Sequence, residues 1–279
     1  MELTGILHAH SKYSYDAKLT LSEIRDICLK NNVQFVCMTE HVDELIEDEA
    51  RDFVDECARF SDQEFLFIPG FEVPYKVNTG DRGDALGNNH AHILMIGKRS
   101  FHGNYAPNIE TLAKWAEGAG FVILAHPVRN QFLVDDGLLG LIDALEVWNQ
   151  QYEGKRVPRT RSLELLEELR SRKHGLLAIG GVDFHRTEHF GTPLITLSVG
   201  TFSELAILEK LNIGAYTVSS PQATFFGTIP NIAELQKKYR LQSALSVVVI
   251  VFGKFVNKRL AQFDIKLPKW MKEIVRKKI

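Results

Sequence analysis

The chain has few cysteines and none of the patterns in which cysteine defines a protein class. Its three cysteines form no CxxC pair, and Cys28, Cys37 and Cys57 all lie in segments expected to be helix or strand. A disulfide framework or a thiolate zinc site is therefore not expected, whereas a reduced, cytoplasmic setting is. The start of the chain lacks a basic segment followed by an apolar one, and no run reaches roughly 18 apolar residues. We therefore expect neither a signal peptide nor a membrane span.

The sequence also lacks an excess of charge of one sign. Its 33 Lys and Arg residues nearly balance 35 Asp and Glu residues, which leaves a formal net charge of -2. This balance gives no sign of a nucleic-acid-binding surface and disfavours an exonuclease. Any preference for an anionic substrate must come from individual residues. The length of 279 residues suffices for one α/β barrel with a small extension.

Short apolar runs alternate with amphipathic segments, and this pattern predicts repeated βα units around a parallel sheet. Thr20 with Glu23 forms the signature of a capping box that opens a helix to about residue 31. Further helices are expected over 44–60, 109–118, 158–172 and 202–211. Strands are expected over 3–7, 34–38, 65–68, 93–96, 121–124, 144–147, 176–179 and 215–218. About seven or eight such units indicate an α/β, barrel-like fold, with the polar segment Asn78 to Asn89 as a candidate substrate lid.

Histidines and carboxylates follow several of these strands. The C-terminal ends of parallel barrel strands share one face, so residues placed there converge although they are far apart in the chain. In His8-Ala9-His10 and Asp183-Phe184-His185, the period of two in a strand puts both polar side chains on one side. Imidazole and carboxylate suit Zn²⁺, Mn²⁺ or Fe²⁺, and the absence of thiolates favours a catalytic site. The residues in these positions are His8, His10, Glu40, His41, Glu72, His126, Asp183 and His185.

The order of these motifs resembles that of a known family. The motifs are Leu7-His8-Ala9-His10, Asp16, Glu40-His41, Gly70-Phe71-Glu72, His92-Ile93-Leu94, Ala125-His126-Pro127 and Asp183-Phe184-His185. Over residues 1 to about 225 the chain resembles the PHP family, the polymerase and histidinol phosphatase domain. The resemblance implies a distorted (β/α)7 barrel over residues 1–226 that binds two or three divalent metal ions.

The resemblance also implies which residues hold each ion. One ion would be held by His8, His10, Glu72 and Asp183. Glu72 would bridge to a second ion, held by His92 and His126. Asp16, His41 and His185 would hold a third. Of the pair His90 and His92, the latter matches the family pattern better, which leaves His90 as a residue behind the ligands, a phosphate contact or an exposed side chain. The acid in the run around Glu146 is usually structural in this family.

Loop cations beside the ligand motifs are candidates for binding phosphate. Arg129 is the strongest of them, because it lies three residues past His126 on the same loop, and it is also a candidate catalytic residue. His189, four residues after His185, could protonate a leaving oxygen. The other candidate substrate contacts are Lys12, Arg82, His90 and Arg186.

The leading functional hypothesis is a metal-dependent phosphoesterase that hydrolyses a small phosphorylated molecule through a metal-bound hydroxide. A binuclear site also attacks carbonyl carbon, so hydrolysis of a carboxylic ester, amide or carbamate is an alternative. A third hypothesis is a catalytically silent, metal-stabilised scaffold. Bound metal without turnover on any substrate would indicate the scaffold.

Residues 227–279 lie beyond the resemblance and form an expected helical C-terminal extension. Apolar side chains recur at helical spacing from Leu241 to Val256, and they cover more than one face. We expect this helix to pack against the barrel or against a partner subunit in a homo-oligomer. A membrane interface is the alternative, because lysines and arginines flank the helix.

Overall fold

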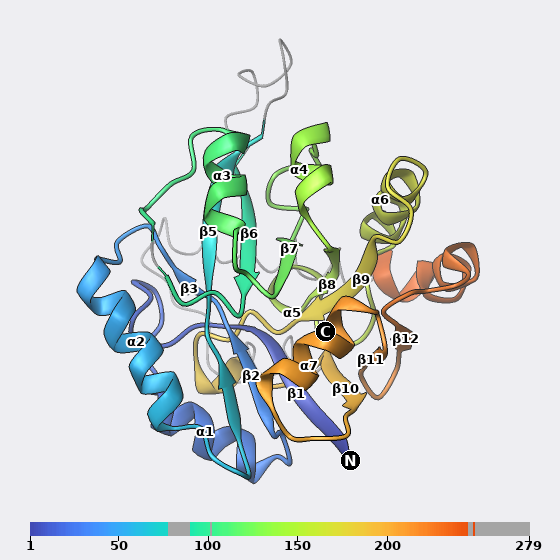
Figure 1. The fold of residues 1–279 in the computed structure, drawn as a ribbon. Coiled ribbons are helices and arrows are strands. Elements are labelled where there is room, and N and C mark those ends of the chain that lie inside the picture. The colour runs from blue at the N-terminus through green and yellow to red at the C-terminus, as the bar shows by residue number, and fades with distance from the viewer. Residues whose placement is uncertain (78–89, 101, 245–247, 249–279) are drawn as a thin grey trace, which may run out of the picture.

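Figure 1 shows the fold in a computed structural model that describes residues 1–77, 90–100, 102–244 and 248. The candidate lid, Asn78 to Asn89, lies outside the described residues together with Arg82. Most of the expected apolar helix also lies outside them, since residues 249–279 are not described. The described strands form two six-stranded sheets, and the helices lie around their periphery (Figure 1).

The first sheet has the strand order β12-β11-β10-β1-β2-β4. β1 pairs with β2, and β2 with β4, in parallel, whereas β10, β11 and β12 join by antiparallel pairing. The strands are β1 (Glu2–Ala9), β2 (Phe35–Met38), β4 (Leu66–Ile68), β10 (Leu194–Ser198), β11 (Tyr216–Ser219) and β12 (Thr224–Phe226).

The second sheet has the order β3-β5-β6-β7-β8-β9. Here β6 runs antiparallel to both β5 and β7, while the other pairs are parallel. The strands are β3 (Glu40–His41), β5 (Gly70–Lys76), β6 (His90–Ile96), β7 (Phe121–Ala125), β8 (Ala144–Asn149) and β9 (Leu177–Gly181).

The expected parallel sheet is thus wrong in part, because both sheets are mixed. The alternation of apolar and amphipathic segments does not distinguish a parallel crossover from an antiparallel return. β11 and β12, for example, are joined only by residues 220–223, a link too short for a parallel crossover. The sequence pattern also misses β3, β5, β10 and β12. These strands are short or follow a proline, so they carry little periodic signal.

The two sheets are connected at the ends of several strands. β2 continues into β3 after Thr39, and β4 continues into β5 after Pro69. The segment that follows β9 is hydrogen-bonded to the C-terminal end of β1. The Val182 amide donates to Leu7 O at 2.9 Å, and the Phe184 amide donates to His8 O at 3.0 Å. A closed barrel is not seen among the described residues, so the fold is a mixed α/β one.

The helices largely match the expected ranges. The capping box is confirmed: the Glu23 amide donates to Thr20 Oγ1 at 3.2 Å, and the Thr20 amide donates to the Glu23 carboxylate at 2.8 Å. The short helices α4 and α5 are not expected from the sequence, because each has little room for a periodic pattern. The helices are α1 (Leu21–Lys30), α2 (Glu47–Arg59), α3 (Ile109–Ala116), α4 (Asp136–Leu141), α5 (Gln150–Glu153), α6 (Thr160–Arg170), α7 (Glu204–Asn212) and the 3-10 helix η2 (Thr187–His189).

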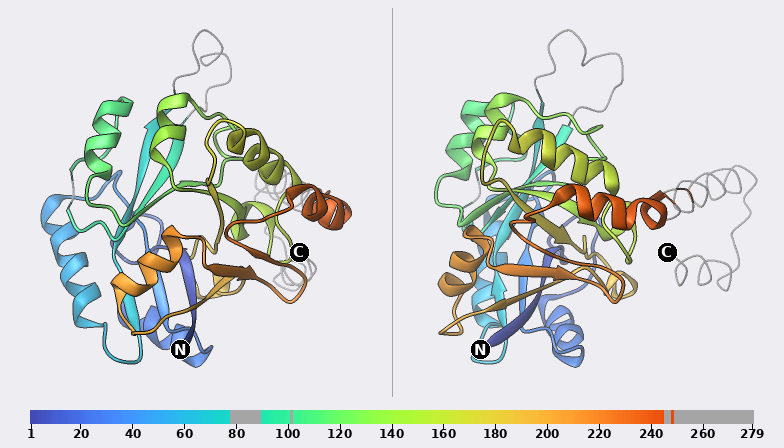
Figure 2. Two further views of the ribbon diagram at one scale, coloured as in Figure 1. Left: turned by 45° about the vertical axis from the view of Figure 1, so that its right-hand side comes forward. Right: turned by 90° about the vertical axis from the view of Figure 1, so that its right-hand side faces the viewer.

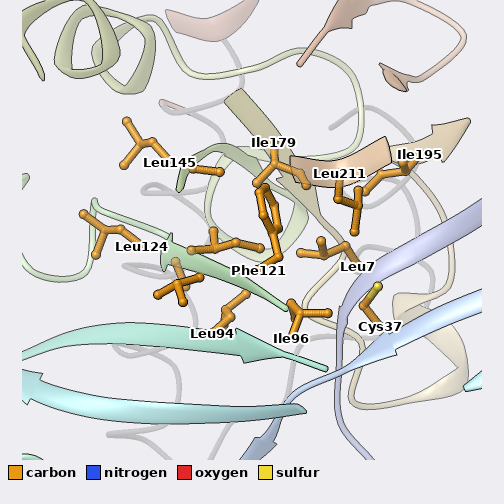
Figure 3. Close-up of a cluster of buried hydrophobic side chains, with 14 of the residues drawn as sticks. Leu7, Cys37, Leu94, Ile96, Phe121, Leu124, Leu145, Ile179, Ile195 and Leu211 are labelled. Carbon is orange, nitrogen blue, oxygen red and sulfur yellow. The ribbon is translucent and has the colours of Figure 1, made fainter. Parts of the chain in front are cut away.

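Strands of both sheets supply the core. In Figure 3, Leu7 of β1 lies near Phe121 of β7 and Ile179 of β9, in one cluster of buried side chains. Burying a large apolar side chain completely contributes about 1.5–3 kcal/mol. The core therefore fixes the strands against one another and holds their ends, where the expected ligands lie.

The C-terminal extension begins with a helix over residues 232–244 that packs beside α6 (Figure 2). The Thr160 amide donates to Ser243 Oγ at 3.0 Å, and Tyr239 is buried in the core cluster. The division into residues 1–226 and 227–279 stays a prediction, as does oligomerisation through the extension. Over the described part of the chain, we find no helix long and apolar enough to cross a membrane.

Candidate metal centre

The expected metal ligands gather in one cluster where the strands of both sheets end. Most of the side chains are buried, whereas Asp16 and His185 lie at the more exposed rim. His8 comes from β1, His41 from β3, Glu72 from β5 and His92 from β6. The loops after β1, β7 and β9 bring the rest of the set, which is His10, Asp16, His126, Asp183 and His185.

Glu72 lies at the centre of the cluster, and its two oxygens face different imidazoles. Its Oε2 atom lies 3.0 Å from His8 Nε2 and 3.2 Å from His10 Nε2. Its Oε1 atom lies 3.1 Å from His126 Nε2 and also contacts His92 Nδ1. A carboxylate placed in this way has the geometry required to bridge two cations.

Asp183 and Asp16 bring carboxylates to other parts of the cluster. Asp183 Oδ1 lies 3.5 Å from His8 Nε2 and 3.4 Å from His185 Nδ1. At the rim, Asp16 Oδ2 lies 3.1 Å from His185 Nε2, and Asp16 Oδ1 lies 3.6 Å from His41 Nε2. Asp16, His41 and His185 therefore lie together, as the family resemblance implies.

The local backbone corrects one step of the sequence argument. His8 does not follow regular strand alternation, because its φ of 68° lies in the left-handed region and the pairing of β1 with β2 shifts register there. Asp183 has a φ of 56° and His126 a φ of 23°. Backbone of this kind costs about 1–3 kcal/mol per residue and gathers at functional sites. A bulge, and not simple alternation, therefore brings His8 to the cluster.

The donor set fits divalent cations. Several groups each offer three ligand atoms within 4.8 Å of one another. Buried ring nitrogens without a hydrogen-bond partner include His41 Nδ1 and His126 Nδ1, and an uncompensated buried polar atom is unfavourable. A cation would satisfy such atoms. The groups are His8/His10/Glu72, His8/His126/Asp183, His41/Glu72/His92 and His10/His41/His185.

The protonation equilibria of the cluster also indicate a need for positive charge. Burial alone would lower the pKa of His10, but hydrogen bonds to Asp183 and Glu72 outweigh it and raise the pKa to about 9. Burial opposes ionisation of Glu72 and Asp183, yet the surrounding imidazoles hold the pKa of both carboxyls well below its usual value. Protons on imidazole thus balance these carboxylates, and metal ions that bind there would replace them.

Glu40 supports the cluster from behind. It is fully buried and accepts hydrogen bonds from the Ser11 amide at 2.9 Å, from Ser11 Oγ at 2.6 Å and from Ser14 Oγ. Ser14 Oγ lies 3.2 Å from His10 Nδ1 and accepts a hydrogen bond from the His41 amide at 2.9 Å. Glu40 therefore contacts the ligands through Ser14. Sequence reasoning placed Glu40 at a strand end but missed Ser14, since a lone serine in a loop carries no signal.

Arg129 lies near the part of the cluster that contains His126. Its side chain hydrogen-bonds to Tyr152, and burial is the main cause that raises the pKa of that tyrosine to about 12. The Tyr152 ring lies 5.0 Å from the His126 ring, and the Tyr15 ring lies 5.1 Å from the His41 ring, between centroids. Neither tyrosine is found by sequence reasoning, because a single aromatic residue in a loop, as for Tyr15, or in a helix as short as α5, as for Tyr152, has no pattern that distinguishes a site from a surface.

The other candidate substrate contacts are less closely associated with the cluster. Lys12 forms an ion pair with Glu56 at 3.0 Å, and His90 lies at the start of β6 beside Tyr105. Arg186 is exposed next to η2. The ring of His189 lies 6.0 Å from that of His185, between centroids. The roles expected for these residues stay predictions.

Comparisons with known proteins support the fold and no closer relationship. No family model matches the chain, and no curated protein does. Among solved structures, one neighbour is a two-domain protein from Bacteroides vulgatus that contains a predicted PHP-like metal-dependent phosphoesterase. It has 15% identity and a TM-score of 0.56, and the match covers 78% of this chain and 65% of that one.

Two further solved structures are similar to this chain. PsfC from Pseudomonas syringae has 17% identity and a TM-score of 0.51, with 86% of this chain and 98% of that chain covered. The lesion-specific endonuclease EndoQ from Pyrococcus furiosus has 16% identity and a TM-score of 0.51, with 78% and 58% covered. The chain thus spans less than two thirds of the Bacteroides and Pyrococcus proteins. At these identities the likeness establishes a PHP-like fold alone.

Proposed function

We propose that this protein is a metal-dependent phosphoesterase that hydrolyses a small phosphorylated molecule. The observation that carries the proposal is the position of Glu72, whose two oxygens face separate groups of imidazoles inside a buried cluster. Two or three Zn²⁺, Mn²⁺ or Fe²⁺ ions would be held by His8, His10, Asp16, His41, Glu72, His92, His126, Asp183 and His185. Such ions would supply an activated water and positive charge for a phosphate oxygen.

The surrounding protein supports this chemistry. Glu40 and the hydroxyl of Ser14 hold His10 from one side, which keeps its Nε2 atom directed at Glu72 and Asp183. Arg129 is the cation best placed to bind phosphate, because its hydrogen bond to Tyr152 holds it beside His126. Arginine is suited to this role, since its planar fork binds two phosphate oxygens at once. His189 remains the candidate for protonating a leaving oxygen.

A finer architecture accompanies this proposal. We propose that the two sheets together correspond to the distorted (β/α)7 barrel of the PHP fold. The hydrogen bonds between the end of β1 and the segment after β9 support it, as does the continuation of β2 into β3 and of β4 into β5.

A substrate panel tests the proposed function. The metal-loaded protein is assayed on phosphorylated metabolites, nucleotides, a single-stranded oligonucleotide, and carboxylic esters and amides. We expect saturable phosphate release from a small phosphorylated compound and inhibition by inorganic phosphate. Turnover confined to the carbonyl substrates would contradict the proposal in favour of the alternative hydrolase. Cleavage of the oligonucleotide alone would make the chain a nuclease, and bound metal without any turnover would make it a scaffold.

Replacing Arg129 by alanine should mainly raise KM for phosphorylated substrates. An arginine that binds phosphate similarly in the ground state and the transition state changes KM more than kcat. Losing one charge-assisted hydrogen bond removes about 1.5–3 kcal/mol, which corresponds to a KM about ten to a hundred times higher. Steady-state kinetics measure the effect, with Arg51→Ala as control, because Arg51 pairs with Glu47 and Asp48 on the surface of α2. An unchanged KM would reduce Arg129 to a structural partner of Tyr152.

A further inference from the structure

Glu146 is a fully buried carboxylate of β8 that lies behind the cluster. Its Oε1 atom lies 3.0 Å from His8 Nδ1, on the side of the ring opposite Glu72. Its Oε2 atom accepts a hydrogen bond from the His126 amide at 2.6 Å and another from Asn149 Nδ2 at 3.0 Å. One carboxylate thus contacts the side chain of one expected ligand and the backbone of a second.

Asn149 extends these contacts to a third ligand. Besides donating to Glu146, its Nδ2 atom donates to Asp183 Oδ2 at 3.4 Å. Its own place is fixed in turn, because Asn149 Oδ1 accepts from the Gln151 amide at 2.9 Å at the start of α5. Glu146 and Asn149 together therefore contact His8, His126 and Asp183.

These ligands share two further properties. His8, His126 and Asp183 form one of the groups whose ligand atoms lie within 4.8 Å of one another. They are also the expected ligands with φ in the left-handed region, at 68°, 23° and 56°. Such backbone is retained only where its surroundings hold it. Glu146 and Asn149 contact all three residues, through the His8 ring, the His126 amide and the Asp183 carboxylate.

The neighbouring strand leaves room for this arrangement. Gly181 of β9 lies so close that a Cβ atom on it would approach Glu146 Oε1 to 1.9 Å and His8 Cβ to 2.8 Å. Beside it, the pairing of β8 with β9 shifts register between Glu146 and Trp148. A larger residue than glycine would displace the carboxylate from the His8 ring.

We propose that Glu146 and Asn149 are positioning residues that form a buried brace for the metal ligands His8, His126 and Asp183. The inference rests on the proposed metal centre. A carboxylate that accepts the Nδ1 proton of His8 fixes the tautomer in which Nε2 has its lone pair free for a cation. The hydrogen bonds to the His126 amide and, through Asn149, to Asp183 hold the other two ligands in their strained backbone. The brace sets metal affinity without touching the metal.

Metal affinity of the full-length protein tests the brace. The metal-free protein is titrated with Zn²⁺ against a chelating dye, and its thermal midpoint is measured in parallel. Glu146→Gln, which keeps size and removes charge, should weaken the binding of one ion about 10- to 100-fold, in the range found when such outer partners are removed. The thermal midpoint without metal should stay near that of the parent, a result that a merely structural role would not give.

The matched control is Asp143→Asn. Asp143 directly precedes β8, its carboxylate accepts a hydrogen bond from the Val122 amide at 2.8 Å, and it lies outside the ligand groups. We expect this variant to bind Zn²⁺ like the parent. Asn149→Ala serves as a second test, should Glu146→Gln not fold, and it should weaken the binding of one ion.

The outcomes separate this inference from the proposed function. If the parent binds Zn²⁺ and both Glu146→Gln and Asn149→Ala bind it equally well, the brace is wrong and the metal centre stands. Equal weakening by Asp143→Asn would also overturn the brace, since the effect would then follow from the loss of any carboxylate on this part of the sheet. A parent protein that binds no metal would overturn both.

Discussion

Replacing Glu72 by glutamine should give a folded protein that has lost two metal ions. Both oxygens of Glu72 are engaged, Oε2 with His8 and His10 and Oε1 with His92 and His126. Glutamine keeps the size of the side chain but offers one oxygen and no charge. A bridging position cannot be satisfied by a single neutral oxygen. We therefore expect metal content to fall by two equivalents, as measured by elemental analysis after gel filtration.

The control for Glu72→Gln is Asp143→Asn, which changes a carboxylate that accepts a hydrogen bond from the Val122 amide and lies outside the ligand groups. Circular dichroism should show the same secondary structure in the parent and in both variants. Loss of a single equivalent would count against bridging and would leave Glu72 as the ligand of one ion. Unchanged metal content would place the metal elsewhere in the molecule.

Replacing Asp183 by asparagine should lower phosphoester turnover about a thousandfold. Asp183 Oδ1 lies between the His8 and His185 rings. Losing its negative charge weakens the binding of metal ions there, and these ions supply the positive charge that the reaction needs. Metal ions contribute several kcal/mol to the stabilisation of a phosphoryl transition state, and about 4 kcal/mol corresponds to this factor. The measurement is kcat/KM on the best substrate of the panel, at saturating Zn²⁺ or Mn²⁺.

His126→Ala should lower turnover similarly, because the Nε2 atom of His126 lies beside Oε1 of the expected bridging residue Glu72. The control is Asp62→Asn, since Asp62 binds the amides of its own turn and Arg25 before β4. The control variant should retain parental rates. Equal rates in Asp183→Asn and in the parent would mean that the measured activity belongs to a contaminant or to another site.

The sequence predicts which histidines and carboxylates come together better than it predicts the fold around them, and their binding of metal stays a prediction. His8 with His10 and Asp183 with His185 can be found because each pair is closely spaced after an apolar run. Their convergence follows from the general placement of sites at strand ends. The sheet order does not follow from the same apolar runs, because the sequence of a short strand such as β12 does not differ between parallel and antiparallel pairing.

The local geometry of the site is beyond what the sequence pattern contains. The left-handed backbone of His8 lies inside an apolar run that otherwise reads as regular strand. Glu146 meets His8 across 138 positions of the chain, so the contact exists only once β8 and β1 are in place. Gly181 is a similar case, since its closeness to Glu146 depends on the register between β8 and β9. Such features result from packing and not from local pattern.

The most direct test of the metal centre is elemental analysis of the full-length protein. The protein is purified without chelators, and a second sample is stripped of metal and then incubated with Zn²⁺ or Mn²⁺ before gel filtration. We predict two to three equivalents of transition metal per chain in the loaded protein, because the groups around Glu72, Asp183 and Asp16 offer that many sites. No transition metal in either sample would contradict the account.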